Sequence, residues 1–573
     1  MYVARIPNRD SPPTYLLRES YRENGRVKNR TLANISHLPI EQIQLLSRVL
    51  KGEQLLPADD ALRITRSWPH GHVRAVLDMF DYLKLPGLIA SRRCRERDLV
   101  LAMIAQRLLE PGSKLATTRL WKNSTLGEEL DVADAEVDEL YHALDWLLGR
   151  QKRVENKLAQ RHLHNGDLVH YDVSSSSYTG ATCVLARFGH NRDGRSDLPC
   201  IVYGVMTDDE GRPISVDVYP GNTGDPTTVP EQMEKLKTRF HLERVVAVGD
   251  RGMLTQTQID TLRKRPGLGW LSALRSDGIR KLMEKGRLER SLFDEQNLAE
   301  INSPDFPGER LVACYNPILA ERRRRKREAL LSATEARLEG IGREVGRRTK
   351  KPMKKDEIGV KVGRVLNKHK VGKHFRLVIE DNVLKWERKQ QAIEKETALD
   401  GIYVIRTSES AEKLSAEEAV RGYKRLADVE QAFRSLKSLE LLVRPIHHRL
   451  ADRVRAHIFV CLLAYYVQWH LKRAWSPLLF ADEHLQEHRA QRDPVATAVP
   501  AAEVHAKKIE RRTDEGHELQ SFRTLLNELG TQCRNRCQLG EGNSVIRFTK
   551  LTDPTSLQTE AFRLLTDYCS QQP

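Results

Sequence analysis

The sequence is poor in cysteine, and its few cysteines are scattered. It has only 8 in 573 residues. They are Cys94, Cys183, Cys200, Cys314, Cys461, Cys533, Cys537 and Cys569. This scatter excludes the disulfide framework of a small secreted domain and predicts reduced thiols in a cytosolic protein. The C-x-x-x-C pair near the end has no second Cys or His pair at zinc-finger spacing, which argues against a zinc site.

Long apolar runs are missing as well. The longest, residues 458–469, is shorter than the roughly 20 residues that cross a bilayer as a helix, and we expect it to form a buried core helix. Residues 1–10, MYVARIPNRD, lack the apolar core that is typical of a signal peptide. We therefore expect a soluble, cytoplasmic protein with no membrane partner.

Acidic residues are outnumbered by basic ones, 78 to 94, which gives a net charge of +16. Such an excess favours a polyanionic partner, with nucleic acid first and a membrane surface second. At 573 residues the chain is too long for one hydrophobic core, so we expect three or more domains. The apolar fraction of 40% supports globular domains.

Two aspartates stand at the ends of apolar strands. The pattern DLVHYDV predicts a strand that ends at Asp172, followed by four serines at 174–177. RVVAVGDRGM predicts a second buried strand, with Asp250 just past its end. Between them, residues 201–206 and 214–219 flank a polar turn and predict a hairpin. An acid beside a buried strand is costly unless it is paired or bound to metal. Each aspartate alone fits a turn or capping role equally well.

A third acid lies on a predicted helix, YKRLADVEQAFRSLK at residues 423–437. At 100° per residue, one face carries Tyr423, Leu426, Glu430, Arg434 and Lys437 within about 80°. A neighbouring apolar stripe suits packing on a core; it comprises Val429, Ala432, Phe433, Leu436 and Leu439. Taken alone, the segment fits an ordinary amphipathic helix with a Glu–Arg pair.

Four motifs taken together resemble a known family. They are YDVSS at 171–175, VGDRGM at 248–253, DGIYVIRTS at 400–408 and YKRLADVEQAFRSLKS at 423–438. Their order and spacing resemble the DDE-type bacterial insertion-sequence transposases, in the subgroup with a large insertion before the catalytic Glu and a Y-x2-R-x3-E-x6-K signature. The resemblance runs from about residue 70 to residue 470. It implies an α/β fold: a ribonuclease-H-like mixed-sheet catalytic core interrupted by an insertion domain, with a helical N-terminal DNA-binding region.

The resemblance also implies the site. Its catalytic and metal-holding residues would be Asp172, Asp250 and Glu430, with two Mg²⁺ ions per site and Mn²⁺ as a substitute. Its DNA-binding residues would be Tyr423, Lys437 and Arg434. The signature arginine position holds Leu426, and Arg425 is one residue early, about 100° around the helix, so it cannot simply substitute.

Changes in sequence pattern then divide the chain into six predicted segments. They are an N-terminal β-rich segment (1–65), a helical DNA-end-binding domain (66–165), the first part of the catalytic core (166–275), an insertion domain of basic helix and strands (276–399), the second part of the core (400–475) and a C-terminal region (476–573). The arginines at 92, 93, 95 and 97 fit either contact with a duplex end or solvated side chains on a helical scaffold. The six basic residues at 322–327 favour phosphate contact over a solvated helix face.

The expected function is metal-dependent cleavage at transposon ends, followed by transfer of the freed 3′-hydroxyl into target DNA. Transposon-end and target DNA would be the partners, bound by a homodimer on paired ends, and the protein would associate with the nucleoid when bound to DNA. A hydrolysis-only nuclease of the same fold, or a catalytically inactive DNA-binding protein, are the alternatives. His447 and His448 could contact a phosphate, but a structural role is commoner for such histidines, and they stay outside the predicted site.

Overall fold

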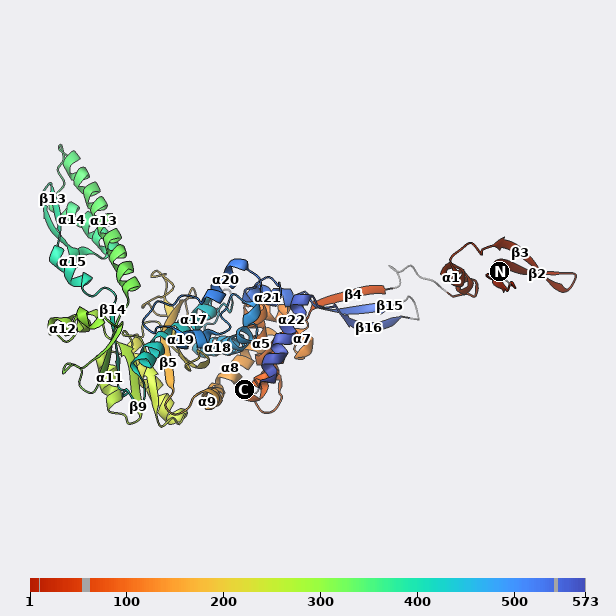
Figure 1. Cartoon of the computed structure of the whole chain (residues 1–573), viewed down its shortest axis with the longest axis horizontal. Helices are drawn as coiled ribbons and strands as arrows, with labels where there is room; N and C mark the ends of the chain where they lie inside the picture. Colours follow the sequence, from red (N-terminus) through yellow and green to blue (C-terminus); the bar gives the residue numbers. More distant parts are fainter. Residues whose placement is uncertain (10, 54–61, 439, 540–544, 572–573) are drawn as a thin grey trace. The chain divides into compact units, whose positions relative to one another are not determined.

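The computed structural model describes residues 1–9, 11–53, 62–438, 440–539 and 545–571 (Figure 1). The chain folds into two compact units. The small unit comprises Met1–Trp68 and Gln532–Asp553, and the large unit comprises Pro69–Thr531 and Pro554–Pro573. All eight cysteines are free thiols, as expected. Among the described residues, no helix is long and apolar enough to cross a membrane.

The small unit is built from antiparallel strands. Its first sheet has the order β1-β2-β3, formed by β1 (Tyr2–Ile6), β2 (Thr14–Glu23) and β3 (Arg26–Asn34). Asn24 and Gly25 connect β2 to β3 with φ of 51° and 78°, the left-handed conformation that a tight hairpin turn requires. Helix α1 (Ile40–Leu50) follows. In the second sheet, β15 (Cys533–Leu539) lies between β4 (Leu62–Pro69) and β16 (Ile546–Leu551), so the sheet joins segments distant in sequence.

The large unit contains an eight-stranded mixed sheet with the order β10-β11-β14-β9-β8-β5-β6-β7. Strands β5 (Leu168–Ser177), β8 (Val245–Val248) and β9 (Leu268–Ala273) are parallel neighbours. The other pairings are antiparallel and involve β6 (Cys200–Thr207), β7 (Pro213–Pro220), β10 (Leu298–Ile301), β11 (Arg310–Tyr315) and β14 (Ile402–Thr407). The predicted hairpin is confirmed as β6 and β7. A mixed α/β fold with this sheet is consistent with the ribonuclease-H-like core expected from the sequence.

Strand β5 is longer than predicted. It does not end at Asp172 but continues through the four serines to Ser177. Serine is tolerated here because its neighbours satisfy the hydroxyl groups. The Ser175 hydroxyl donates to the main-chain oxygen of His190 at 3.0 Å, and the Ser176 hydroxyl bonds the Tyr203 hydroxyl at 2.9 Å. Asp172 therefore lies within the strand rather than at its end.

The core of the large unit surrounds one apolar helix, α18 (Ala451–Ala474). Most of its residues are buried, which confirms the prediction of a core helix. It packs against β7 and against helices α5 (Arg95–Leu109) and α8 (Val137–Leu148). Helix α17 (Leu426–Lys437) packs on β5, and its stripe residues Val429, Ala432, Phe433 and Leu436 are buried, as predicted. Leu439, the fifth residue of that stripe, lies outside the described residues.

The helix predicted over residues 423–437 is two helices. Helix α16 (Ala416–Lys424) ends at Arg425, and α17 begins at the next residue. The Arg425 side chain forms an ion pair with Asp209 and donates to the main-chain oxygen of the same residue at 3.2 Å. These contacts hold the junction against the loop after β6. The prediction of one continuous face from Tyr423 to Lys437 is therefore wrong.

The chain leaves the sheet after β11 and returns at β14. Between them lie α13 (Pro317–Arg347), α14 (Lys355–His369), β12 (Phe375–Glu380), β13 (Val383–Arg388) and α15 (Gln390–Thr397) (Figure 1). They share apolar clusters in which Leu338, Ile358 and Trp386 take part. Strands β10 and β11 fall within the range 276–399 predicted as the insertion, yet they belong to the sheet. Arg327 of the basic run forms a buried ion pair with Asp400 at the base of α13.

Candidate active site

One cleft of the large unit, about 720 Å³ in volume, is lined by all three predicted acids. Asp172 comes from β5, Asp250 from the turn after β8, and Glu430 from α17. The β5–β8 pairing brings the two aspartates to neighbouring strands, and the packing of α17 on β5 adds the glutamate. Residues separated by some 250 positions along the chain thus meet at one surface.

Asp172 is partly buried in the sheet, opposite Val205 of β6. Its Oδ1 accepts a hydrogen bond from the main-chain nitrogen of Val173 at 2.7 Å. Burial raises its pKa to about 7; the charge of Asp250 adds to the shift, and Val173 N and Arg192 oppose it. The carboxylate therefore stands where an added positive charge would stabilise it.

Asp250 lies two residues after β8 and is exposed. Its Oδ1 accepts hydrogen bonds from the main-chain nitrogens of Gly252 at 2.9 Å and Met253 at 2.7 Å, which fix the turn. A β-carbon at Gly252 would meet both carboxylate oxygens at 3.3 Å, closer than most side chains tolerate. The glycine keeps the approach to the carboxylate open.

Glu430 differs from the two aspartates because its side chain is 62% exposed. Among the described residues it pairs with Arg434, one helical turn later, at 3.8 Å. Among the described residues, no group of three or more His, Cys, Asp or Glu is close enough to hold a metal ion as it stands. The three carboxylates supply the oxygen ligands that Mg²⁺ and Mn²⁺ prefer, so the donor chemistry fits a divalent cation.

The predicted DNA-binding residues lie in three different environments. Arg434 is exposed at the cleft. Lys437 is nearly buried there, and its amine donates to the main-chain oxygen of Ser175 at 2.6 Å and to Asp193 at 3.2 Å. Tyr423 lies in the last turn of α16 and packs in an apolar cluster with Leu426, the residue at the signature arginine position. Burial raises the pKa of Tyr423 to about 12, and the charges of Asp250 and Glu430 add to the shift.

The cleft also holds charged residues that the sequence did not single out. Arg192 forms an ion pair with Asp225, and Asp193 accepts a hydrogen bond from Ser177 N at 2.8 Å. Arg444 lies 2.5 Å from the same Asp193 carboxylate. Burial alone would raise the pKa of Asp193, but Ser177 N and the charges of Lys437 and Arg444 bring it below its ordinary value. The dense charge of HNRDGR, residues 190–195, was the one signal in the sequence.

Three of the four arginines considered for contact with a duplex end pair within their own region. Arg93 lies 2.7 Å from Asp98, and Arg97 lies 3.6 Å from the same carboxylate. Arg95 bridges Asp134 at 2.8 Å and Glu139 at 3.1 Å. These pairs support the scaffold interpretation for these three side chains.

Two family models match this sequence. The Transposase DDE domain matches residues 181–467, half of the chain, and includes Asp250 and Glu430. The chain belongs to the DDE-type insertion-sequence transposases. The IS1634 family transposase, N-terminal domain, matches residues 3–59 of this transposase. A comparison with curated proteins finds no match.

The N-terminal match extends the family resemblance beyond the range identified from the motifs. The N-terminal match covers β1, β2, β3 and α1 of the small unit; residues 10 and 54–59 within it lie outside the described part. The catalytic match begins after Asp172, so the assignment of that acid depends on its place in the sheet and cleft. This transposase is therefore an enzyme that acts on DNA. Its family depends on a divalent metal ion.

Proposed function

We propose that this transposase cleaves DNA at the ends of its element and transfers the freed 3′-hydroxyl into target DNA, with Asp172, Asp250 and Glu430 as its catalytic acids. The observation that carries this proposal is that the three carboxylates, from β5, the end of β8 and α17, line one cleft. Cationic side chains line the walls of this cleft.

Asp172, Asp250 and Glu430 would hold the divalent cations, two Mg²⁺ per site with Mn²⁺ as a substitute. When bound, such ions neutralise charge on the phosphoryl oxygens and favour the ionised form of the attacking oxygen. The raised pKa of Asp172 supports this role, because burial and the charge of Asp250 outweigh the opposing charge of Arg192. Asp172 must lose its proton before it can act as a ligand.

The cationic side chains of the cleft would position the DNA backbone. Arg434 is exposed and free to turn toward a phosphate, and its planar guanidinium suits two parallel hydrogen bonds. Lys437 and Tyr423 would contribute an ammonium and a hydroxyl donor. Such backbone contacts set the register of the DNA without reading its sequence. Arg192 and Arg444 extend the same wall and would share this task.

The helical region of residues 66–165 would bind the transposon end, and two copies of the chain would assemble on paired ends. The net charge of +16 supports a DNA partner in general. The test of assembly is light scattering of the full chain with and without end DNA. A complex of two chains and two ends is expected, and a single chain on a single end would contradict the proposal.

The test of the chemistry is an assay with Mg²⁺ and DNA carrying the ends of the element. Asp172→Asn, Asp250→Asn and Glu430→Gln should each lower cleavage at least about 1,000-fold, because each removes a ligand oxygen. Asp277→Asn, an exposed carboxylate on α12 (Ser276–Glu284), is the control and should cleave normally. Near-normal cleavage by one of the three variants would remove that residue from the site.

Pre-cleaved ends incubated with plasmid and Mg²⁺ separate transposition from simple hydrolysis. Joined products are expected. Cleavage of intact ends without any joining would favour a nuclease of the same fold.

A further inference from the structure

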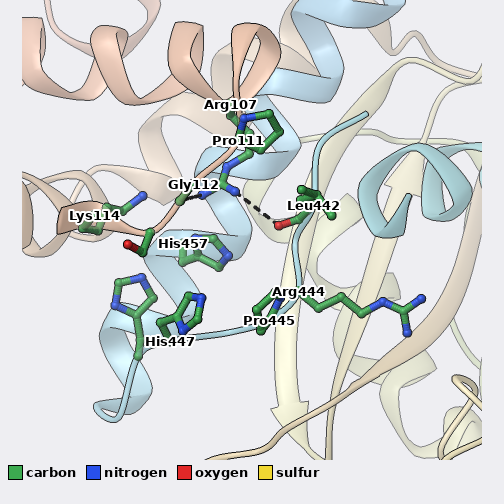
Figure 2. A pocket seen from close by; sticks show the side chains of 11 residues that line it. Arg107, Pro111, Gly112, Lys114, Leu442, Arg444, Pro445, His447 and His457 are labelled. Atoms are coloured by element: carbon green, nitrogen blue, oxygen red, sulfur yellow. Dashed lines mark hydrogen bonds between the residues drawn. The ribbon is translucent and has the colours of Figure 1, made fainter. Parts of the chain in front are cut away.

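A second pocket, about 200 Å³ in volume, lies apart from the three acids in the large unit (Figure 2). Its walls are the end of α5, the start of α6 (Lys114–Leu120), the segment 442–448 and α18. Arg444 lines both this pocket and the cleft, and its side chain points away from the pocket histidines (Figure 2). The segment 442–448 is thus a wall that the two cavities share.

The pocket is cationic, and its two cations are buried. Arg107 and Lys114 are each only 5% exposed. Arg107 donates to the main-chain oxygens of Leu442 and Gly112, both at 3.2 Å (Figure 2). Among the described residues that line the pocket, none is an Asp or a Glu. Burying two cations without a carboxylate is unfavourable unless another negative charge is supplied.

Lys114 is the clearest sign of a missing ligand. Within the described part of the chain its amine has no hydrogen-bond or ion-pair partner, although it lines the pocket. Burial, with the charge of Arg107 in addition, lowers its pKa to about 7. An ammonium group normally donates three hydrogen bonds, so a bound anion would satisfy it and restore its charge.

Histidines complete the pocket. His457 bonds the main-chain oxygen of Val443 through Nε2 at 2.9 Å, and its buried Nδ1 has no partner among the described residues. The His448 ring lies beside it at a tilt of 48°, with ring centroids 5.2 Å apart, and His447 lies at the rim. The ring nitrogens add hydrogen-bonding groups to the two cations.

A metal ion does not fit these residues. Two of the nearest groups are cations, and the described residues contain no cluster of His, Cys, Asp or Glu arranged to hold an ion. An apolar ligand would leave Lys114 and Arg107 without a counter-charge. A tetrahedral oxyanion offers several acceptors to an ammonium, a guanidinium and imidazoles at once.

We propose that the pocket formed by Arg107, Lys114 and His448 binds a phosphate group. The phosphate is either free phosphate or the terminal phosphate of a DNA strand, since both present the same oxygens. The inference goes beyond the cleavage chemistry and does not depend on the three acids. A phosphate held there would fix the wall that carries Arg444 at the cleft.

The experiment titrates the full chain with sodium phosphate and follows both heat of binding and melting temperature, against sodium chloride at equal ionic strength. Phosphate should bind saturably and raise the melting temperature more than chloride. Lys114→Met should weaken phosphate binding about tenfold or more, because it removes the charged donor. Arg119→Met, the matched control on the exposed face of α6, removes one positive charge outside the pocket and should bind like the wild type.

Equal effects of phosphate and chloride, or equal losses in the two variants, would overturn the proposal. Lys114→Met should fold, because methionine fills a buried site without a charge. If it does not, tungstate soaked into crystals of the wild type gives the second measurement. Its anomalous signal is expected between Lys114 and His448, and a pocket without signal would overturn the inference.

Oligonucleotides with and without a 5′-phosphate distinguish the sources. If only the phosphorylated strand competes with inorganic phosphate, the ligand of the pocket is the terminal phosphate of DNA. If neither strand competes, the ligand is free phosphate. Asp250→Asn should lose cleavage and keep phosphate binding. A failure of the catalytic proposal and a failure of this one are therefore separable.

Discussion

Lys437 Nζ lies 3.2 Å from Oδ1 of Asp193, so the lysine of the signature is paired with a carboxylate before any DNA arrives. Arg444 approaches the other oxygen of the same carboxylate at 2.5 Å. Asp193 thus holds two cations on one wall of the cleft. A DNA phosphate would have to share or replace this carboxylate to engage Lys437.

Replacing Asp193 should destabilise the fold. Asp193→Asn leaves Lys437 and Arg444 without their carboxylate, and we expect a loss of about 3 kcal/mol in the free energy of unfolding. Urea denaturation measures this loss. Asp197→Asn is the control in the same loop, because its pair with Arg195 is exposed, and it should leave the free energy of unfolding nearly unchanged. Equal stability of the two variants would show that Asp193 does not organise the wall.

The pKa of Asp172 predicts a pH-dependent effect on stability in the absence of metal. In the folded chain Asp172 stays protonated up to about pH 7, whereas the ordinary pKa of an aspartate is 3.8. The contribution of this proton to the stability of the folded state is therefore fully present below pH 3.8. It is lost as the pH rises through 7. Asparagine does not titrate, so Asp172→Asn does not suffer this loss. The free energy of unfolding of the variant, relative to that of the wild type, should rise between pH 5 and pH 8 by up to about 3 kcal/mol.

Thermal unfolding in the presence of a chelator measures this dependence. Glu430→Gln removes an exposed carboxylate of the same cleft and should show little change of its effect with pH. A constant difference between Asp172→Asn and the wild type over this range would contradict the buried, protonated state.

The basic run at residues 322–327 should divide into two classes of residue. Arg327 is 9% exposed and its guanidinium lies 2.5 Å from the equally buried Asp400, whereas Arg325 is 79% exposed and pairs with Glu321 on its own helix. Arg327→Met should lower the free energy of unfolding by about 3 kcal/mol, because Asp400 remains buried and unpaired. Arg325→Met should cost less than about 0.5 kcal/mol. Urea denaturation and limited proteolysis of the 317–400 segment test this, and similar values for both would contradict it.

Tyr423 should separate packing from DNA contact. Tyr423→Phe keeps the ring in its apolar cluster and removes the hydroxyl, so stability should change by less than about 1 kcal/mol while affinity for end DNA falls several-fold. Tyr423→Ala should lose about 3 kcal/mol of stability because it also empties the ring's volume. Chemical denaturation and DNA titration give the two measurements. Unchanged DNA affinity in Tyr423→Phe would leave the residue a packing role only.

The sequence by itself predicted the strands, the core helix and the motifs that contain Asp172, Asp250 and Glu430. These features are local: an apolar run predicts β8, a motif contains Asp250, and a periodic apolar stripe predicts the buried face of α17. The order of the motifs was enough to indicate the family. The sequence did not predict the extension of β5 or the break between α16 and α17 at Arg425. Both depend on partners distant in sequence: Tyr203 contacts the extended part of β5, and Asp209 pairs with Arg425.

Only the tertiary structure showed which charged residues contact one another. Asp193 joins the site through the end of β5, Lys437 and Arg444, and no spacing in the sequence relates these positions. Lys114 likewise stands out only in the tertiary structure, where it is buried beside Arg107 and histidines more than 300 residues later in the chain. Periodicity reports which face a residue occupies on its own element, whereas the partner of a buried charge is set by how the elements pack.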